Sequence, residues 1–76
     1  MNAKYKAVNL KKPWQQNDQW VIKDDKSQIA YGEMDDRREA ELMVIALNSM
    51  PEHEISEDVF GDVAKWLEDR NIELYL

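Results

Sequence analysis

The sequence contains no cysteine, and this absence excludes disulfides, zinc–thiolate sites and thiol nucleophiles together. A chain without cysteine fits a reducing compartment, so we expect a cytoplasmic protein. Glycine and proline occur only twice each, which leaves no glycine-rich loop of the kind that cradles phosphates. No stretch comes near the roughly 20 apolar residues of a membrane span, and the lysines near the N-terminus are not followed by the apolar core of a signal peptide.

The apolar residues that are present suffice for one small core. Apolar residues make up 43% of the 76, and three Trp and three Tyr are among them. A chain of this length buries only about 60% of the surface that it exposes when unfolded. We therefore expect a single domain over residues 1–76, too small to enclose a deep cofactor pocket.

The first part of the chain predicts a small antiparallel sheet. Its apolar residues come in short runs separated by polar clusters, and Pro13 interrupts the pattern because proline cannot donate to a ladder. The polar stretch 24–27 predicts the turn of a hairpin, and Gly32 suggests a bulge or a strand exit. The sheet is expected to have two to three strands, at about 4–10, 19–23 and 29–33.

After residue 34 the period becomes helical. Asp36 with Glu39 forms a capping box for a helix over about 36–50, which Pro51 ends. Ser56 is the predicted N-cap of a second, amphipathic helix over about 57–70. Its apolar face is expected to hold Val59, Phe60, Val63, Ala64, Trp66 and Leu67. The segment 72–75 alternates between apolar and polar residues, so it predicts either a C-terminal edge strand or a tail that packs across the core. The fold class is α+β.

The first helix is apolar nearly all round, with six apolar residues in a row at 42–47. Such a helix needs cover on more than one side. A position between the sheet and the second helix provides that cover, and we favour this interpretation because the second helix has a matching apolar face. Homodimerisation through Leu42 and Ile45 is the alternative.

Charge is divided by position along the chain. Residues 1–32 hold six lysines and three aspartates, a balance of +3, whereas residues 33–76 hold thirteen acids and four basic residues, a balance of −9. The total is −6. The acids belong to the helical part, so we expect one strongly negative side, which bears on solubility and on partners rather than on fold.

Five acids of the second helix and its start form the best continuous candidate for a docking surface. They are Glu57, Asp58, Asp62, Glu68 and Asp69. Such a surface would steer a basic partner and set the register of binding, although a solvated helix face that keeps the protein soluble explains the same residues. Trp14 follows Pro13 in a loop and would be a rigid aromatic anchor for binding, but a Trp that folds back to close the core is the simpler interpretation.

The sequence offers no constellation for catalysis, metal or cofactor. His53 lies in a short linker between carboxylates, without the nucleophile or substrate pocket that a general base needs beside it. We therefore interpret it as a solvated loop residue. The pairs 24–25 and 35–36 lack the alternating oxygens of a calcium loop. A basic strand with an aromatic could bind nucleic acid through Lys4, Lys6, Lys11 and Lys12, but the total charge of −6 opposes phosphate binding.

The stretch 20–51 resembles small phage and prophage accessory proteins of the hairpin-plus-helix type. The residues that carry the resemblance are Trp20-Val21-Ile22-x-Asp24, Ile29-Ala30, Glu39-Ala40-Glu41 and Ala46-Leu47-Asn48-x-Met50-Pro51. The resemblance implies an origin in a mobile element, where small acidic proteins often inhibit host machinery, as anti-CRISPR proteins do. It carries over no functional residues.

Charge pattern and resemblance together predict a non-enzymatic protein-binding module without a cofactor. The expected partner is a host protein, such as a nucleic-acid-binding protein or a CRISPR effector, in the host cytoplasm. A structural or regulatory homodimer is the first alternative, and a nucleic-acid binder that uses the basic N-terminal strand is the second.

Overall fold

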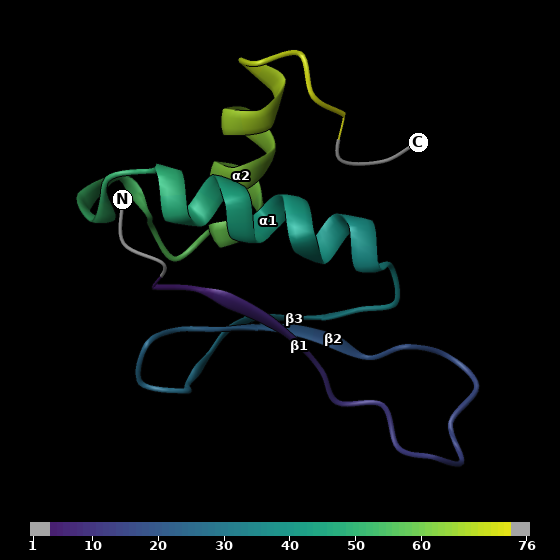
Figure 1. Ribbon diagram of the computed structural model, residues 1–76. Helices are drawn as coiled ribbons and strands as arrows, with labels where there is room; N and C mark the ends of the chain where they lie inside the picture. The colour runs from purple at the N-terminus through teal and green to yellow at the C-terminus, as the bar shows by residue number, and fades with distance from the viewer. Residues whose placement is uncertain (1–3, 74–76) are drawn as a thin grey trace.

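Residues 4–73 are described by a computed structural model, which confirms the predicted α+β fold with three antiparallel strands and two α-helices (Figure 1). A single 3-10 turn, η1, separates the helices. In chain order the elements are β1 (Lys6–Asn9), β2 (Trp20–Lys23), β3 (Ile29–Met34), α1 (Arg37–Ser49), η1 (Glu52–Glu54) and α2 (Val59–Glu68).

The sheet has the strand order β1-β2-β3, so β2 is the central strand. Ala7, Ile22 and Tyr31 lie side by side across the three strands and belong to the core on the α1 side. The predicted irregularity near Gly32 is present, because Gly32 pairs with Val21 while the next register partners are Trp20 and Met34. The intervening residue is a bulge, which bends the strand.

Local capping explains the bounds of α1. The carboxylate of Asp36 accepts a hydrogen bond from the backbone N–H of Arg38 at 2.9 Å, which satisfies one of the free donors at the helix start. At the other end the N–H of Met50 still donates to Ala46 O at 3.0 Å, and Pro51 then adopts extended backbone. The predicted helix over 36–50 is therefore confirmed to within its caps.

The start of α2 differs from the prediction. Asp58 is the N-cap and accepts from the N–H of Gly61 at 3.1 Å, so the proposed cap at Ser56 is wrong. The N–H and hydroxyl of Ser56 donate instead to Asp62 Oδ2, at 2.7 and 2.8 Å. Asp58 directly precedes Val59, the first helical residue, so its carboxylate accepts from the free N–H of Gly61. The hydroxyl of Ser56 bonds instead to the side chain of Asp62, one turn into the helix.

The end of α2 is a Schellman motif. Asn71 has a positive φ of 58°, its N–H donates to Glu68 O at 3.0 Å, and the N–H of Ile72 donates to Leu67 O at 2.9 Å. Ile72 packs against the core. Ile72 and Glu73 therefore follow the helix without entering the sheet, and the rest of the segment 72–75 lies outside the described residues.

Both helices lie on one side of the sheet, with α1 directly over it (Figure 1). The core fills the space between the sheet, α1 and α2; its fully buried members are Ile22, Ala40, Met43, Ala46, Val63 and Leu67. Helix α2 also reaches the sheet, since the rings of Phe60 and Tyr31 lie 5.8 Å apart. The expectation that the sheet and α2 together cover the apolar surface of α1 is confirmed for Leu42, which packs against the core, and is wrong for Ile45, which is 53% exposed.

Neither helix within residues 4–73 has the length and apolar content that crossing a membrane requires.

Candidate functional site

The acids predicted as a docking surface divide into two groups in the structure. Asp58 and Asp62 have local partners, since Asp58 caps α2 and Asp62 binds Ser56. The hydrogen bonds from the backbone N–H and then the hydroxyl of Ser56 hold the pKa of Asp62 below its ordinary value. Glu57, Glu68 and Asp69 are exposed. The surface is therefore negative, but two of its five carboxylates also stabilise the start of the helix.

A hollow of about 390 Å³ brings two of these acids together with an aromatic ring. Asp62 and Asp69, one on each side of Lys65 along α2, line it with the indole of Trp66. Met50 and Glu54, from the end of α1 and from η1, complete the lining. Three carboxylates thus face one ammonium group. Glu57 and Glu68 lie outside this hollow.

Trp66 already carries a cation on its ring. The guanidinium carbon of Arg70 lies 3.7 Å from the ring centroid, and Arg70 Nη1 donates to the backbone oxygen of Trp66 at 3.1 Å. A guanidinium over an indole is a favourable cation–π arrangement. Sequence reasoning missed Trp66 and Glu54, because helical periodicity assigned Trp66 to the apolar face. The half-buried indole extends to the edge of that face instead.

Trp14 does not close the core. Its side chain is 79% exposed, on the long loop between β1 and β2, so the interpretation that it folds back is wrong. The loop leaves the sheet on the side away from α2 (Figure 1). Trp14 and the acids of α2 therefore lie at opposite ends of the molecule and cannot belong to one small contact surface.

Hydrogen bonds give the Trp14 loop a defined shape. Asn9 Oδ1 accepts from the N–H groups of Lys11 and Gln19, at 3.0 and 3.1 Å. Gln15 Oε1 accepts from the N–H of Lys12 at 2.6 Å, and its own N–H donates to Lys12 O at 3.0 Å, which closes the turn that carries Trp14. Exposed aromatic residues on an ordered loop lose little entropy on binding.

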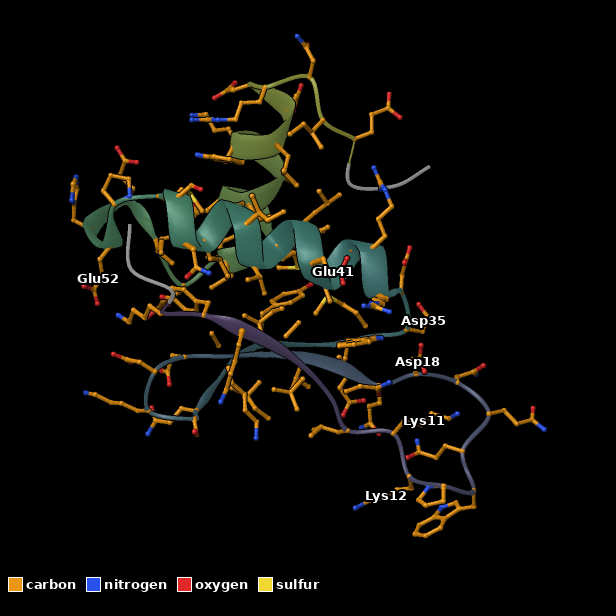
Figure 2. The ribbon with its side chains drawn as sticks, viewed as in Figure 1. Lys11, Lys12, Asp18, Asp35, Glu41 and Glu52 are labelled. Carbon is orange, nitrogen blue, oxygen red and sulfur yellow. The ribbon has the colours of Figure 1, made fainter. Side chains whose placement is uncertain are left out.

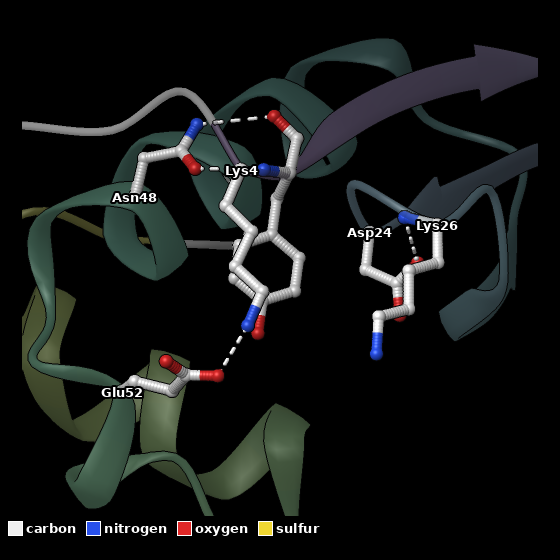
Figure 3. A network of polar contacts seen from close by, with 6 residues as sticks. Lys4, Asp24, Lys26, Asn48 and Glu52 are labelled. Carbon is white, nitrogen blue, oxygen red and sulfur yellow. Dashed lines mark hydrogen bonds and ion pairs between the residues drawn. The ribbon is translucent and has the colours of Figure 1, made fainter.

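A second hollow, of about 420 Å³, is lined by Lys4, Tyr5, Asn48 and Glu52 among others. The polar contacts of these residues, which Figure 3 shows, have a structural role. Asn48 holds the chain just before β1, because its Oδ1 accepts from the N–H of Tyr5 at 2.8 Å and its Nδ2 donates to Tyr5 O at 3.1 Å. Lys4 forms an ion pair with Glu52 beside it. The hydrogen bond within this pair, from Lys4 Nζ to the carboxylate of Glu52, raises the pKa of Lys4 and lowers the pKa of Glu52.

A third hollow, of about 550 Å³, lies at the other end of the sheet and is lined by Asp18, Gln19, Tyr31, Glu33, Met34, Asp35 and Glu39. Figure 2 shows Asp18 and Asp35 at this end. Gln19 Nε2 donates to Glu33 at 2.7 Å, and Asn9 Nδ2 donates to Asp18 at 3.2 Å. No group of three or more His, Cys, Asp or Glu side chains within residues 4–73 is arranged to hold a metal ion.

Comparison with known proteins adds no assignment. The chain has no significant match among protein-family models, curated proteins or solved structures.

Proposed function

We propose that this chain is a non-enzymatic protein-binding module that docks a basic segment of a partner protein into the hollow on α2. The hollow lined by Glu54, Asp62, Asp69, Lys65 and Trp66 carries the proposal, because three carboxylates outnumber one ammonium group beside a partly exposed indole. This surface keeps the predicted acidic docking role and replaces Trp14 with Trp66 as its aromatic anchor.

The two kinds of side chain have different parts in binding. Carboxylates that face solvent attract a basic partner and raise the association rate, an effect that salt weakens. The indole supplies contact area, and Trp is among the residues that contribute most at interfaces. The stack of Arg70 on Trp66 is an intramolecular example of the contact that an arginine or lysine of the partner would make.

The finer version of the proposal follows from the resemblance to phage accessory proteins. In that version the protein comes from a mobile element and inhibits a host defence protein in the host cytoplasm. CRISPR effectors hold nucleic acid in positively charged channels, to which an acidic surface is complementary.

Capture of partners from a host lysate tests the proposal with a matched pair of variants. Asp69→Asn and Glu68→Gln each remove one charge from adjacent exposed positions, but only Asp69 lines the hollow. We expect a stoichiometric partner for the wild type, weaker capture by Asp69→Asn, and unchanged capture by Glu68→Gln. Capture that is indifferent to salt, or that falls equally in both variants, contradicts docking in the hollow.

A homodimer is a second candidate, favoured by one observation. Ile45 is 53% exposed on the side of α1 that no described element covers. Light scattering of the wild type and of Ile45→Lys at tens of micromolar tests this candidate. A wild-type dimer that Ile45→Lys converts to a monomer supports it, whereas a wild-type monomer excludes it.

A further inference from the structure

The face of the sheet that points away from the helices has a chemistry of its own. Ala7 and Ile22 point toward α1, so their neighbours along the strands point to the opposite face. That outer face therefore carries Lys6, Val8, Val21 and Lys23, of which Val21 is buried. No described helix covers it (Figure 1).

Lys6 and Lys23 are direct register partners on β1 and β2. Like charges directly opposite each other destabilise a sheet, and within residues 4–73 neither lysine forms an ion pair. Lysine is a common protection for an exposed edge strand. That reason covers Lys6 but not Lys23, because β2 is the central strand.

The Trp14 loop extends this basic surface. Figure 2 shows Lys12 on the side of the sheet opposite α1, below the strands, with Lys11 next to it in the loop. Trp14, two residues after Lys12, is the most exposed large apolar side chain of the described residues. The uncovered face thus carries two ammonium groups, and the loop that follows β1 adds Lys11, Lys12 and an exposed indole.

We propose that the outer face of the sheet, with Lys6, Lys23, Lys11, Lys12 and Trp14, binds single-stranded nucleic acid. Lysines would neutralise backbone phosphates, and Trp14 would stack on a base, which only an unpaired strand offers. This site is separate from the acidic hollow on α2, so a failure of one of the two proposals leaves the other untouched.

The net charge of −6 does not oppose this site at physiological ionic strength. The molecule measures 38 × 31 × 21 Å, and both helices lie on the other side of the sheet from this face (Figure 1). The Debye length is about 8 Å under these conditions, so charges on opposite faces are largely screened from each other. Four charged acids lie closer to this surface, so the local balance of charge decides whether phosphate binds: Asp18 and Glu33 accept hydrogen bonds from the neutral amides of Asn9 and Gln19, and Asp24 and Asp25 directly follow Lys23.

Fluorescence polarisation with a labelled oligo-dT of about 12 nucleotides tests the proposal, since single-strand sites span roughly 4–16 nucleotides. We expect binding whose log K falls with log salt at a slope of about −3, from four phosphate contacts at about 0.7 each. Trp14→Ala should weaken binding about 5- to 150-fold, the range of base–aromatic stacking. The variant should fold, because the side chain that it removes is 79% exposed.

Matched controls separate this site from general polyanion binding. The double variant Lys6→Gln/Lys23→Gln should reduce the salt slope by about 1.4, whereas Lys65→Gln on α2 should leave it unchanged. An abasic oligonucleotide of equal charge and a DNA duplex should both bind more weakly than oligo-dT. The proposal is overturned by an absence of binding near 50 mM salt, by equal binding of the abasic strand, or by an equal effect of Lys65→Gln.

Discussion

Removal of the Asn48 side chain should release the N-terminal end of the sheet from α1. The Asn48 amide makes two hydrogen bonds to the backbone of Tyr5, at 2.8 and 3.1 Å, across 43 residues of sequence. Each such bond contributes about 0.5–1.5 kcal/mol net, so Asn48→Ala should lower the free energy of unfolding by about 1–3 kcal/mol. A domain of this size has about 4–11 kcal/mol in total, so the loss is a large fraction.

Thermal unfolding followed by circular dichroism measures this loss. A drop of about 1–3 kcal/mol corresponds to a fall in Tm of roughly 5–20 °C for a domain of 60–100 residues. Asn17→Ala is the matched control, because Asn17 is exposed and makes no hydrogen bond within residues 4–73; it should change stability by less than about 0.5 kcal/mol.

Hydrogen exchange locates the effect. The Tyr5 amide should lose protection in Asn48→Ala, while amides in the middle of α1 should lose only what the lower global stability accounts for. If Asn48→Ala were as stable as Asn17→Ala, or if the Tyr5 amide kept its protection, the side chain of Asn48 would not hold the strand in place.

Three further substitutions test local features of the fold. Ser27 has a φ of 61°, which costs a non-glycine residue about 1 kcal/mol, so Ser27→Gly should raise the denaturation midpoint or leave it unchanged, and a clear fall would contradict the turn geometry. Asp58→Ala removes the N-cap bond to Gly61 and should cost about 1 kcal/mol in chemical denaturation; no loss would reject the cap. The pKa of Asp62 is depressed, so its bonds to Ser56 stabilise the fold above the ordinary aspartate pKa, and this contribution is lost as pH falls through the folded pKa. Ser56→Ala removes the hydroxyl donor and should raise the Asp62 pKa in a carboxyl-carbon NMR titration; an unmoved pKa would show that this hydroxyl bond does not form.

Local signals predicted the elements of the fold well where each boundary had one dominant cause. Asp36 and Pro51 bound α1 in the structure as in the prediction. The start of α2 was misplaced because Ser56 and Asp58 are both good caps, and only the folded helix shows that Asp62 takes the hydroxyl of Ser56.

The candidate site was predicted less completely, for a physical reason. Periodicity assigns a residue to a face but does not say how far a long side chain extends, so Trp66 was counted as core although it lines the hollow. Trp14 is exposed on a loop that contains hydrogen bonds of Asn9 and Gln15, and sequence spacing does not reveal those bonds. Asn48 offered one usable signal, as a polar residue near the end of an apolar helix.

The separation of charge onto two faces is the central claim, and NMR titration of the three tryptophan indole N–H signals tests it most directly. A lysine- and arginine-rich peptide should shift the Trp66 signal and leave that of Trp14 unmoved, whereas oligo-dT should shift Trp14 and leave Trp66. Trp20, whose indole nitrogen is buried in the core, is the internal control for both ligands. If both ligands moved the same indole, or if neither moved Trp14 or Trp66, two functional faces of opposite charge would be excluded.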